Sequence, residues 1–220
     1  MVIAILWFLQ RYGNRPIRRF IPVLLPDRFI DRILDDHIRF LFQVCLKPRS
    51  GKRNGLVSVD TGELLPATPR LFVPYALPFD YTPTAPPPVE WFKFLASVWG
   101  DDAESIESLQ EWLGYLLTAD TSQQKALLLV GPRRSGKGTI GRVIVQLLGE
   151  RNVASPTLAS LGNNFGLEPL IGKACALMSD ARLGGRADIA AVAENLLRLT
   201  GEDAVSVDRK FREAYTARLL

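Results

Sequence analysis

The segment Gly131–Thr139, which reads GPRRSGKGT, constrains the fold of this chain more than any other feature. It follows Lys125–Val130, a short continuous apolar run typical of a strand buried on both faces. It overlaps the start of Lys137–Leu148, in which apolar residues recur at helical spacing until Gly149. A glycine-rich turn between a buried strand and a helix predicts a phosphate-binding loop. Glycines let backbone N–H groups curl around phosphate oxygens, and the helix directs its positive end at the same anion.

The residues of this loop have distinct expected roles. Lys137 supplies a mobile positive charge for the β- and γ-phosphates of ATP. The residue after such a lysine is normally Ser or Thr, whose hydroxyl binds Mg²⁺, but here it is Gly138 and the hydroxyl follows at Thr139. We therefore expect Thr139 to contact the metal or a phosphate. The expected ATP contacts are Gly131, Pro132, Arg133, Arg134, Ser135, Gly136, Lys137, Gly138 and Thr139.

A second buried strand is predicted at Ala174–Met178, and Asp180 follows it. Ligands of parallel sheets bind at the carboxyl ends of the strands, where an acid can hold Mg²⁺ directly or through water. The alternative for Asp180 is an ordinary surface acid. A further helix is predicted after the capping residue Asp188, running through Leu199 and ended by Gly201. Strands that alternate with helices predict an α/β fold with a parallel sheet.

Upstream of this region, two segments differ from it in composition and expected structure. Residues 1–50 are basic and apolar, and we expect a segment of unclear origin there. Residues 51–122 are predicted to form a small domain, irregular at first and then helical from Val89, with a second helix after Asp101 or Asp102. Residues 123–220 are predicted to form the nucleotide-binding domain.

The apolar run Met1–Leu9 is shorter than the roughly 20 residues that a membrane span requires. The arginines follow the run rather than precede it, which is the wrong order for a secretory signal. We therefore expect a helix that packs into a core, and no membrane association.

Composition narrows the classes of function. The net charge is +4, and basic residues are concentrated in the first 53 positions, which suits a polyanionic partner or an ordinary solvated surface. The chain has two cysteines, Cys45 and Cys175, and one histidine, His37, whereas a zinc site needs about four N/S ligands. The lack of a disulfide framework suits a cytoplasmic protein.

Several stretches together resemble superfamily 3 helicases of the phage and plasmid primase type. They are LQEWLGYLLTADTSQQKALLLVGPRRSGKGT (Leu109–Thr139), LASLGNNFGLEPLIGK (Leu158–Lys173), ALMSDAR (Ala176–Arg182) and LLRLTGEDAVSVDRKFREAY (Leu196–Tyr215). Upstream, DTGELLPATP (Asp60–Pro69) resembles the small domain that precedes this helicase. The resemblance spans roughly residues 54–220.

This resemblance implies an AAA+-like P-loop NTPase that forms ring hexamers and uses ATP and Mg²⁺ to move along single-stranded DNA. It assigns Lys137 and Thr139 to ATP and Asp180 to Mg²⁺. The family often has two adjacent acids after the second strand, whereas this chain has Ser179 and Asp180. Glu194 is therefore the remaining candidate for the base that activates water.

The stretch Gly201–Tyr215 resembles the family's next motif, which ends in a DNA-contacting hairpin. We expect strands at Ala204–Asp208 and Arg212–Ala217. A cation suits a phosphate and an aromatic ring suits a base or sugar, which is the chemistry that a single strand requires. The alternative is an ordinary charged hairpin. The expected DNA contacts at the tip are Arg209, Lys210 and Phe211.

In the family, the sequence continues with a strand that ends in a polar sensor residue, followed by an arginine finger. Both features are expected beyond Leu220. In that fold the missing strand lies between the two strands predicted above. We therefore expect an incomplete sheet with two unpaired central edges, and a truncated chain that is inactive alone.

The predicted function is the ATP-binding module of a DNA replication helicase or primase-helicase of a phage or plasmid. Two alternatives remain open. A nucleoside monophosphate kinase shares the GKGT of Gly136–Thr139, although it would require an arginine-rich lid and a monophosphate pocket that this sequence lacks. A non-catalytic remnant that binds nucleotide or DNA is the other.

Overall fold

The computed structural model describes residues 2–8, 43–46, 55–58, 63–66, 75–82, 84–118, 121–179 and 188–219 of the 220-residue chain. The chain divides into two compact units, which we describe separately. Unit 1 comprises Met1–Gly13 and Ala119–Leu220, and unit 2 comprises Asn14–Thr118. All described candidate nucleotide-binding and DNA-binding residues lie in unit 1.

The described part of unit 2 contains a small antiparallel sheet and two helices. Strand β3 (Gly55–Ser58) pairs with β2 (Gln43–Leu46) on one side and with β4 (Leu64–Pro66) on the other. Helix α2 spans Val89–Trp99, and helix α3 spans Ala103–Leu116.

Helix α2 has the boundaries that the sequence predicts, and helix α3 begins where the sequence predicts. Helix α2 stops at Gly100, whose φ of 61° is a left-handed conformation that glycine adopts without steric cost. Helix α3 begins after Asp102, whose side chain accepts a hydrogen bond from the Ser105 N–H at 3.1 Å. The apolar face of α3 is turned inward. Its buried residues are Leu109, Trp112 and Leu116.

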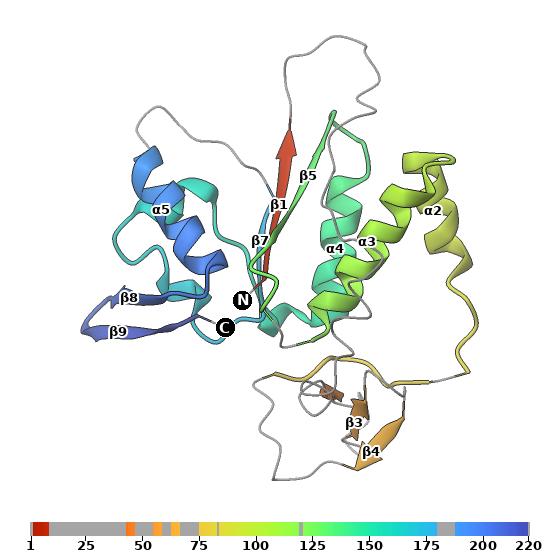
Figure 1. Cartoon of the computed structure of the whole chain (residues 1–220), viewed down its shortest axis with the longest axis horizontal. Helices are drawn as coiled ribbons and strands as arrows, with labels where there is room; N and C mark the ends of the chain where they lie inside the picture. Colours follow the sequence, from red (N-terminus) through yellow and green to blue (C-terminus); the bar gives the residue numbers. More distant parts are fainter. Residues whose placement is uncertain are drawn as a thin grey trace. The chain divides into compact units, whose positions relative to one another are not determined.

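Unit 1 is built on a four-stranded sheet in which every neighbouring pair is parallel. The order across the sheet is β5 (Ala126–Gly131), β1 (Val2–Phe8), β7 (Cys175–Met178) and β6 (Val153–Ala154). Helices α4 (Lys137–Leu148) and α5 (Ile189–Thr200) lie on opposite sides of it (Figure 1). The mixed α/β class is as predicted, and the AAA+ assignment remains a prediction.

The N-terminal strand β1 occupies the centre of this sheet. It pairs with β5 over Ile3–Phe8 and with β7 over Val2–Ile5. The prediction of a helix at Met1–Leu9 is therefore wrong. A continuous apolar run has no period that separates a helix from a strand buried on both faces, and this run is rich in β-branched and aromatic residues that favour strands.

The same strand contradicts the expectation of two unpaired central edges. Strands β5 and β7 both pair with β1, so backbone groups that face the space between them find partners in the ladder. The N-terminal segment of the chain thus completes the centre of the sheet that carries the candidate phosphate-binding loop.

The remainder of unit 1 consists of short helices and a hairpin. The chain forms the 3₁₀ turns η1 (Glu150–Asn152) before β6, then η2 (Leu158–Gly162) and η3 (Glu168–Leu170) between β6 and β7. After α5, strands β8 (Ala204–Arg209) and β9 (Arg212–Arg218) form an antiparallel hairpin. The hairpin prediction is confirmed, with each strand one residue longer than expected.

One apolar cluster packs these elements against the sheet. It includes side chains of β7, α5, β8 and the short helices. Its most deeply buried members are Leu161, Leu170, Ala176, Met178, Val192, Val205 and Val207. Among the helices that the structure describes, none is both long enough and apolar enough to cross a membrane.

Candidate nucleotide and DNA site

The loop between β5 and α4 has the backbone form of an anion cradle. Strand β5 ends at Gly131 and helix α4 begins at Lys137. Arg134 and Gly136 have positive φ angles, 63° and 84°, whereas Ser135 between them does not. When right-handed and left-handed backbone conformations alternate along a loop, successive N–H groups point toward the same side. The loop therefore presents its donors together with the positive end of α4.

Several of these donors are available to a ligand. In the part of the chain that the structure describes, the backbone N–H groups of Arg134, Ser135, Gly136 and Gly138 have no hydrogen-bond acceptor. This is the ordinary condition of the first N–H groups of a helix, which have no partner within it. The chain thus concentrates backbone donors between the end of β5 and the first turn of α4.

The Lys137 side chain is folded back onto this loop and is only 5% exposed. Its Nζ donates to the carbonyl oxygens of Gly131 and Pro132 at 2.8 and 2.7 Å and to Ser135 Oγ at 2.8 Å. Burial lowers the pKa of the Lys137 ammonium below its usual 10.5. The ammonium is therefore held among oxygen atoms inside the loop.

Glycine at position 131 leaves room for this arrangement. A Cβ added there would lie 2.9 Å from Ser135 Oγ and 3.6 Å from Lys137 Nζ. At Gly138 the situation differs, because the nearest atom to an added Cβ would be Arg142 Nη1 at an ordinary 3.7 Å. The loop therefore has space for a Cβ at position 138, so a close backbone approach does not require glycine there. The neighbouring Thr139 is half-buried, and its Oγ1 accepts a hydrogen bond from Arg142 Nη2 at 3.0 Å.

The two acids predicted for catalysis are not brought to this loop by any described contact. Glu194 lies on α5 with a side chain 72% exposed and forms an ion pair with Arg198 at 3.9 Å. It makes no hydrogen bond or ion pair with the loop. Asp180 lies outside the described residues, and no cluster of three or more potential metal ligands occurs among those that are described.

The tip of the hairpin exposes a cation and an aromatic ring. Phe211 is 94% exposed and has a φ of 60°. Lys210 Nζ lies 5.2 Å from the centroid of its ring. Arg209 is held within the hairpin instead, because its Nε and Nη2 donate to the Glu213 carbonyl at 2.9 and 2.8 Å and its guanidinium lies over Tyr215. Lys210 and Phe211 are thus the tip residues that extend outward.

A second exposed aromatic residue, Phe165, was not predicted from the sequence. It is 45% exposed, has a φ of 61° and borders a cavity of about 480 Å³. The loop beneath it is tight, since a Cβ on Gly166 would lie 1.8 Å from the Ser160 carbonyl oxygen. The sequence signal that could have indicated it is a bulky aromatic residue that follows two asparagines and precedes a glycine. Other cavity-lining residues are Asn163, Asn164, Pro169 and Lys173.

The hairpin and this cavity are neighbours in unit 1. The backbone N–H of Lys210 donates to Glu168 Oε2 at 3.4 Å. Glu168 begins η3, and the next residue, Pro169, lines the cavity. The exposed rings of Phe165 and Phe211 therefore belong to adjoining parts of one surface.

Residues 129–220 match a protein family described as "Family of unknown function (DUF5906)". The match begins within β5 and continues to the end of the chain, so it includes the candidate phosphate-binding loop, α4, α5 and the hairpin. The description assigns no activity to these elements.

Proposed function

We propose that unit 1 is the ATP-binding module of a DNA replication helicase or primase-helicase, of phage or plasmid type, that couples ATP hydrolysis to movement on single-stranded DNA. The observation that carries this proposal is the seating of Lys137 inside a loop of outward backbone donors at the start of α4. Strand β5, the loop, Lys137 and the N-terminal end of α4 together form an arrangement that suits a triphosphate.

The residues of the loop have defined tasks in this proposal. Lys137 exchanges its bonds to the Gly131 and Pro132 carbonyls for phosphate oxygens, and the loop N–H groups donate to the same phosphates. Thr139 and Asp180 carry the oxygen donors that Mg²⁺ prefers. Glu194 remains the candidate base, and the family that the chain resembles forms ring hexamers.

The proposed DNA surface combines the hairpin tip with the neighbouring cavity. Lys210 suits a phosphate, and Phe211 suits stacking against a base or sugar. Phe165 adds a second ring on the adjoining surface. A bulky residue with positive φ is a costly conformation that persists mainly at functional sites, and both rings have it.

Substitutions at the tip should separate charge from stacking in single-stranded DNA binding. Lys210→Ala should reduce the slope of log affinity against log salt by about 0.7, since one phosphate contact is lost. Phe211→Ala and Phe165→Ala should each cost about 1–3 kcal/mol of stacking and leave that slope unchanged. The measurement is fluorescence anisotropy of a labelled oligothymidylate over a range of salt concentrations.

The control is Lys93→Ala, which removes an exposed lysine whose partner is Glu90 on α2. It should bind DNA like the parent chain. If the three tip and cavity variants also bind like the parent at every salt concentration, this surface has no role in DNA binding, and the helicase part of the proposal fails.

The lowered pKa of Lys137 predicts a pH dependence of ATP binding. The polyphosphate favours the charged ammonium, so ATP affinity should fall as pH rises through the lowered pKa, in the alkaline range below 10.5. Binding should take up protons in that range. The same shift acts oppositely on folding, because the unfolded chain holds this proton more tightly and stability therefore rises with pH there.

Proton uptake can be measured by calorimetric titration of ATP in two buffers of different ionisation enthalpy. Lys137→Arg is the matched control, because a guanidinium does not lose its proton in this range. Equal uptake by the parent chain and by Lys137→Arg would show that Lys137 is not the titrating group.

A further inference from the structure

Among the described residues of unit 1, positive φ outside glycine occurs only at a few polar and aromatic positions. A positive φ is uncommon at residues other than glycine, and a residue that adopts it often has a functional role. Three such residues belong to the candidate loop and the proposed DNA surface, namely Arg134, Phe165 and Phe211. The other two, Gln124 and Glu202, lie on two segments that side-chain hydrogen bonds connect. Among the described residues, the non-glycine positions with positive φ are Gln124, Arg134, Phe165, Glu202 and Phe211.

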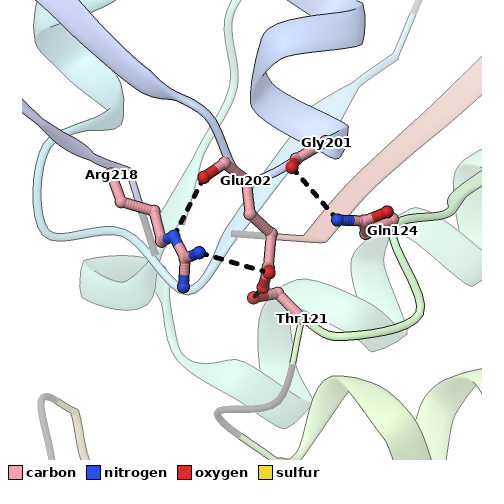
Figure 2. Close-up of polar contacts among 5 residues, drawn as sticks. All are labelled: Thr121, Gln124, Gly201, Glu202 and Arg218. Atoms are coloured by element: carbon pink, nitrogen blue, oxygen red, sulfur yellow. Dashed lines mark hydrogen bonds and ion pairs between the residues drawn. The ribbon is translucent and has the colours of Figure 1, made fainter.

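Gln124 and Glu202 belong to a polar cluster, here called the clamp. The clamp consists of Thr121, Gln124, Gly201, Glu202 and Arg218 (Figure 2). Gln124 Nε2 donates to the Gly201 carbonyl at 3.1 Å, and Thr121 Oγ1 donates to the Glu202 carboxylate. Each of the two strained residues thus uses its side chain to bind the opposite segment.

Arg218 closes the clamp from the end of β9. Its Nε donates to the Glu202 backbone carbonyl at 2.9 Å, and its Nη2 lies 3.7 Å from the Glu202 carboxylate. The Glu202 side chain is only 16% exposed, whereas the Arg218 side chain is 52% exposed, so only the carboxylate side of this ion pair is shielded from water. The carboxylate therefore contacts two segments at once.

A glutamate is unusual at this position. Glu202 follows Gly201, which ends α5, and the left-handed position after a helix is normally occupied by glycine or asparagine. Glycine would adopt this φ without strain. The contacts of the Glu202 side chain with Thr121 and Arg218 offset the cost of the backbone conformation.

The clamp connects the start of β5 with the base of the hairpin. Thr121 and Gln124 lie in the turn that leads directly into β5, the strand that carries the candidate loop. Glu202 precedes β8, and Arg218 ends β9 opposite Ala204. The clamp is therefore a polar connection between the base of the DNA hairpin and the strand of the nucleotide loop.

We propose that the clamp couples the hairpin to the nucleotide site, so that ATP binding and single-stranded DNA binding influence each other through Gln124 and Glu202. This inference rests on the proposed function. The clamp side chains are positioning residues in this scheme, since they lie outside both the candidate loop and the tip of the hairpin. Their loss affects the linkage between the two ligands rather than either binding site.

The test measures the affinity of the full chain for a labelled oligothymidylate with and without a non-hydrolysable ATP analogue and Mg²⁺. In the parent chain the analogue should change DNA affinity by about 5- to 150-fold, and DNA should change the affinity for the analogue by the same factor. In Gln124→Ala and Glu202→Gln this factor should fall toward one. The affinity for each ligand alone should stay as in the parent.

Two further variants guard against effects on folding. Thr121→Val removes a hydroxyl and keeps the shape, and Glu202→Gly removes the side chain and relieves the positive φ. Both should fold and both should lose coupling. Glu150→Gln, an exposed residue outside the clamp, should retain it.

The outcomes distinguish this inference from the proposed function. If the clamp variants keep the parent's coupling factor, or if the parent binds both ligands independently, the clamp is structural only and the inference is wrong, whereas the proposed function stands. If the folded parent binds neither ligand, the proposed function itself is wrong.

Discussion

Replacing Ile5 by proline should unfold or strongly destabilise unit 1. Ile5 pairs with Leu128 of β5 on one side and with Met178 of β7 on the other, at the centre of the sheet. Proline removes the backbone N–H and is found in sheets almost only at edges and bulges. The lost ladder bond contributes about 0.5–1.5 kcal/mol, and a buried carbonyl left without a donor adds about 1–3 kcal/mol. Thermal denaturation should therefore show a fall in Tm of about 10 °C or more.

Ile5→Val is the matched control, because valine keeps both the backbone N–H and the preference for strands. It should melt close to the parent. Hydrogen exchange should locate the damage, with faster exchange of β5 and β7 amides in Ile5→Pro only. A parent-like melting curve for Ile5→Pro would show that β1 does not form the centre of the sheet.

The elements that could be predicted from the sequence are those with local signals. The apolar run before Gly131 and the helical spacing after Lys137 are enough to predict β5 and α4. Residues that cap helices, such as Asp102 and Asp188, mark where α3 and α5 begin, and each accepts a hydrogen bond from a backbone N–H three residues on. The hairpin was predictable in the same way, with a resemblance that indicated its place.

What could not be predicted depends on pairing between distant segments. The centre of the sheet is filled by β1, which is far from β5 and β7 in the chain, and an apolar run does not specify its partners. Phe165, Gln124 and Glu202 were missed because their importance lies in backbone conformation. A positive φ at a non-glycine residue leaves no mark in the sequence. The DNA contact predicted for Arg209 stays a prediction, and the sequence did not indicate that its Nε and Nη2 donate to the hairpin's own backbone.

Lys137→Ala should weaken ATP binding by about 10- to 150-fold, which corresponds to the loss of one charge-assisted phosphate contact of about 1.5–3 kcal/mol. The variant should still fold. Lys137 is a buried cation with a lowered pKa, so removing it also removes the desolvation cost of that charge. Lys137→Arg should not restore full affinity, because a planar guanidinium is a poor substitute for a compact ammonium in so enclosed a position.

The central claim is that the loop of unit 1 binds ATP, and a calorimetric titration of ATP with Mg²⁺ into the parent chain and into Lys137→Ala tests it most directly. Lys93→Ala, which removes an exposed lysine of unit 2, serves as the control for a general loss of positive charge. We predict saturable binding by the parent and by Lys93→Ala, and an affinity about 10- to 150-fold lower for Lys137→Ala. No binding by the folded parent chain, or equal affinity of the parent and Lys137→Ala, would contradict the claim.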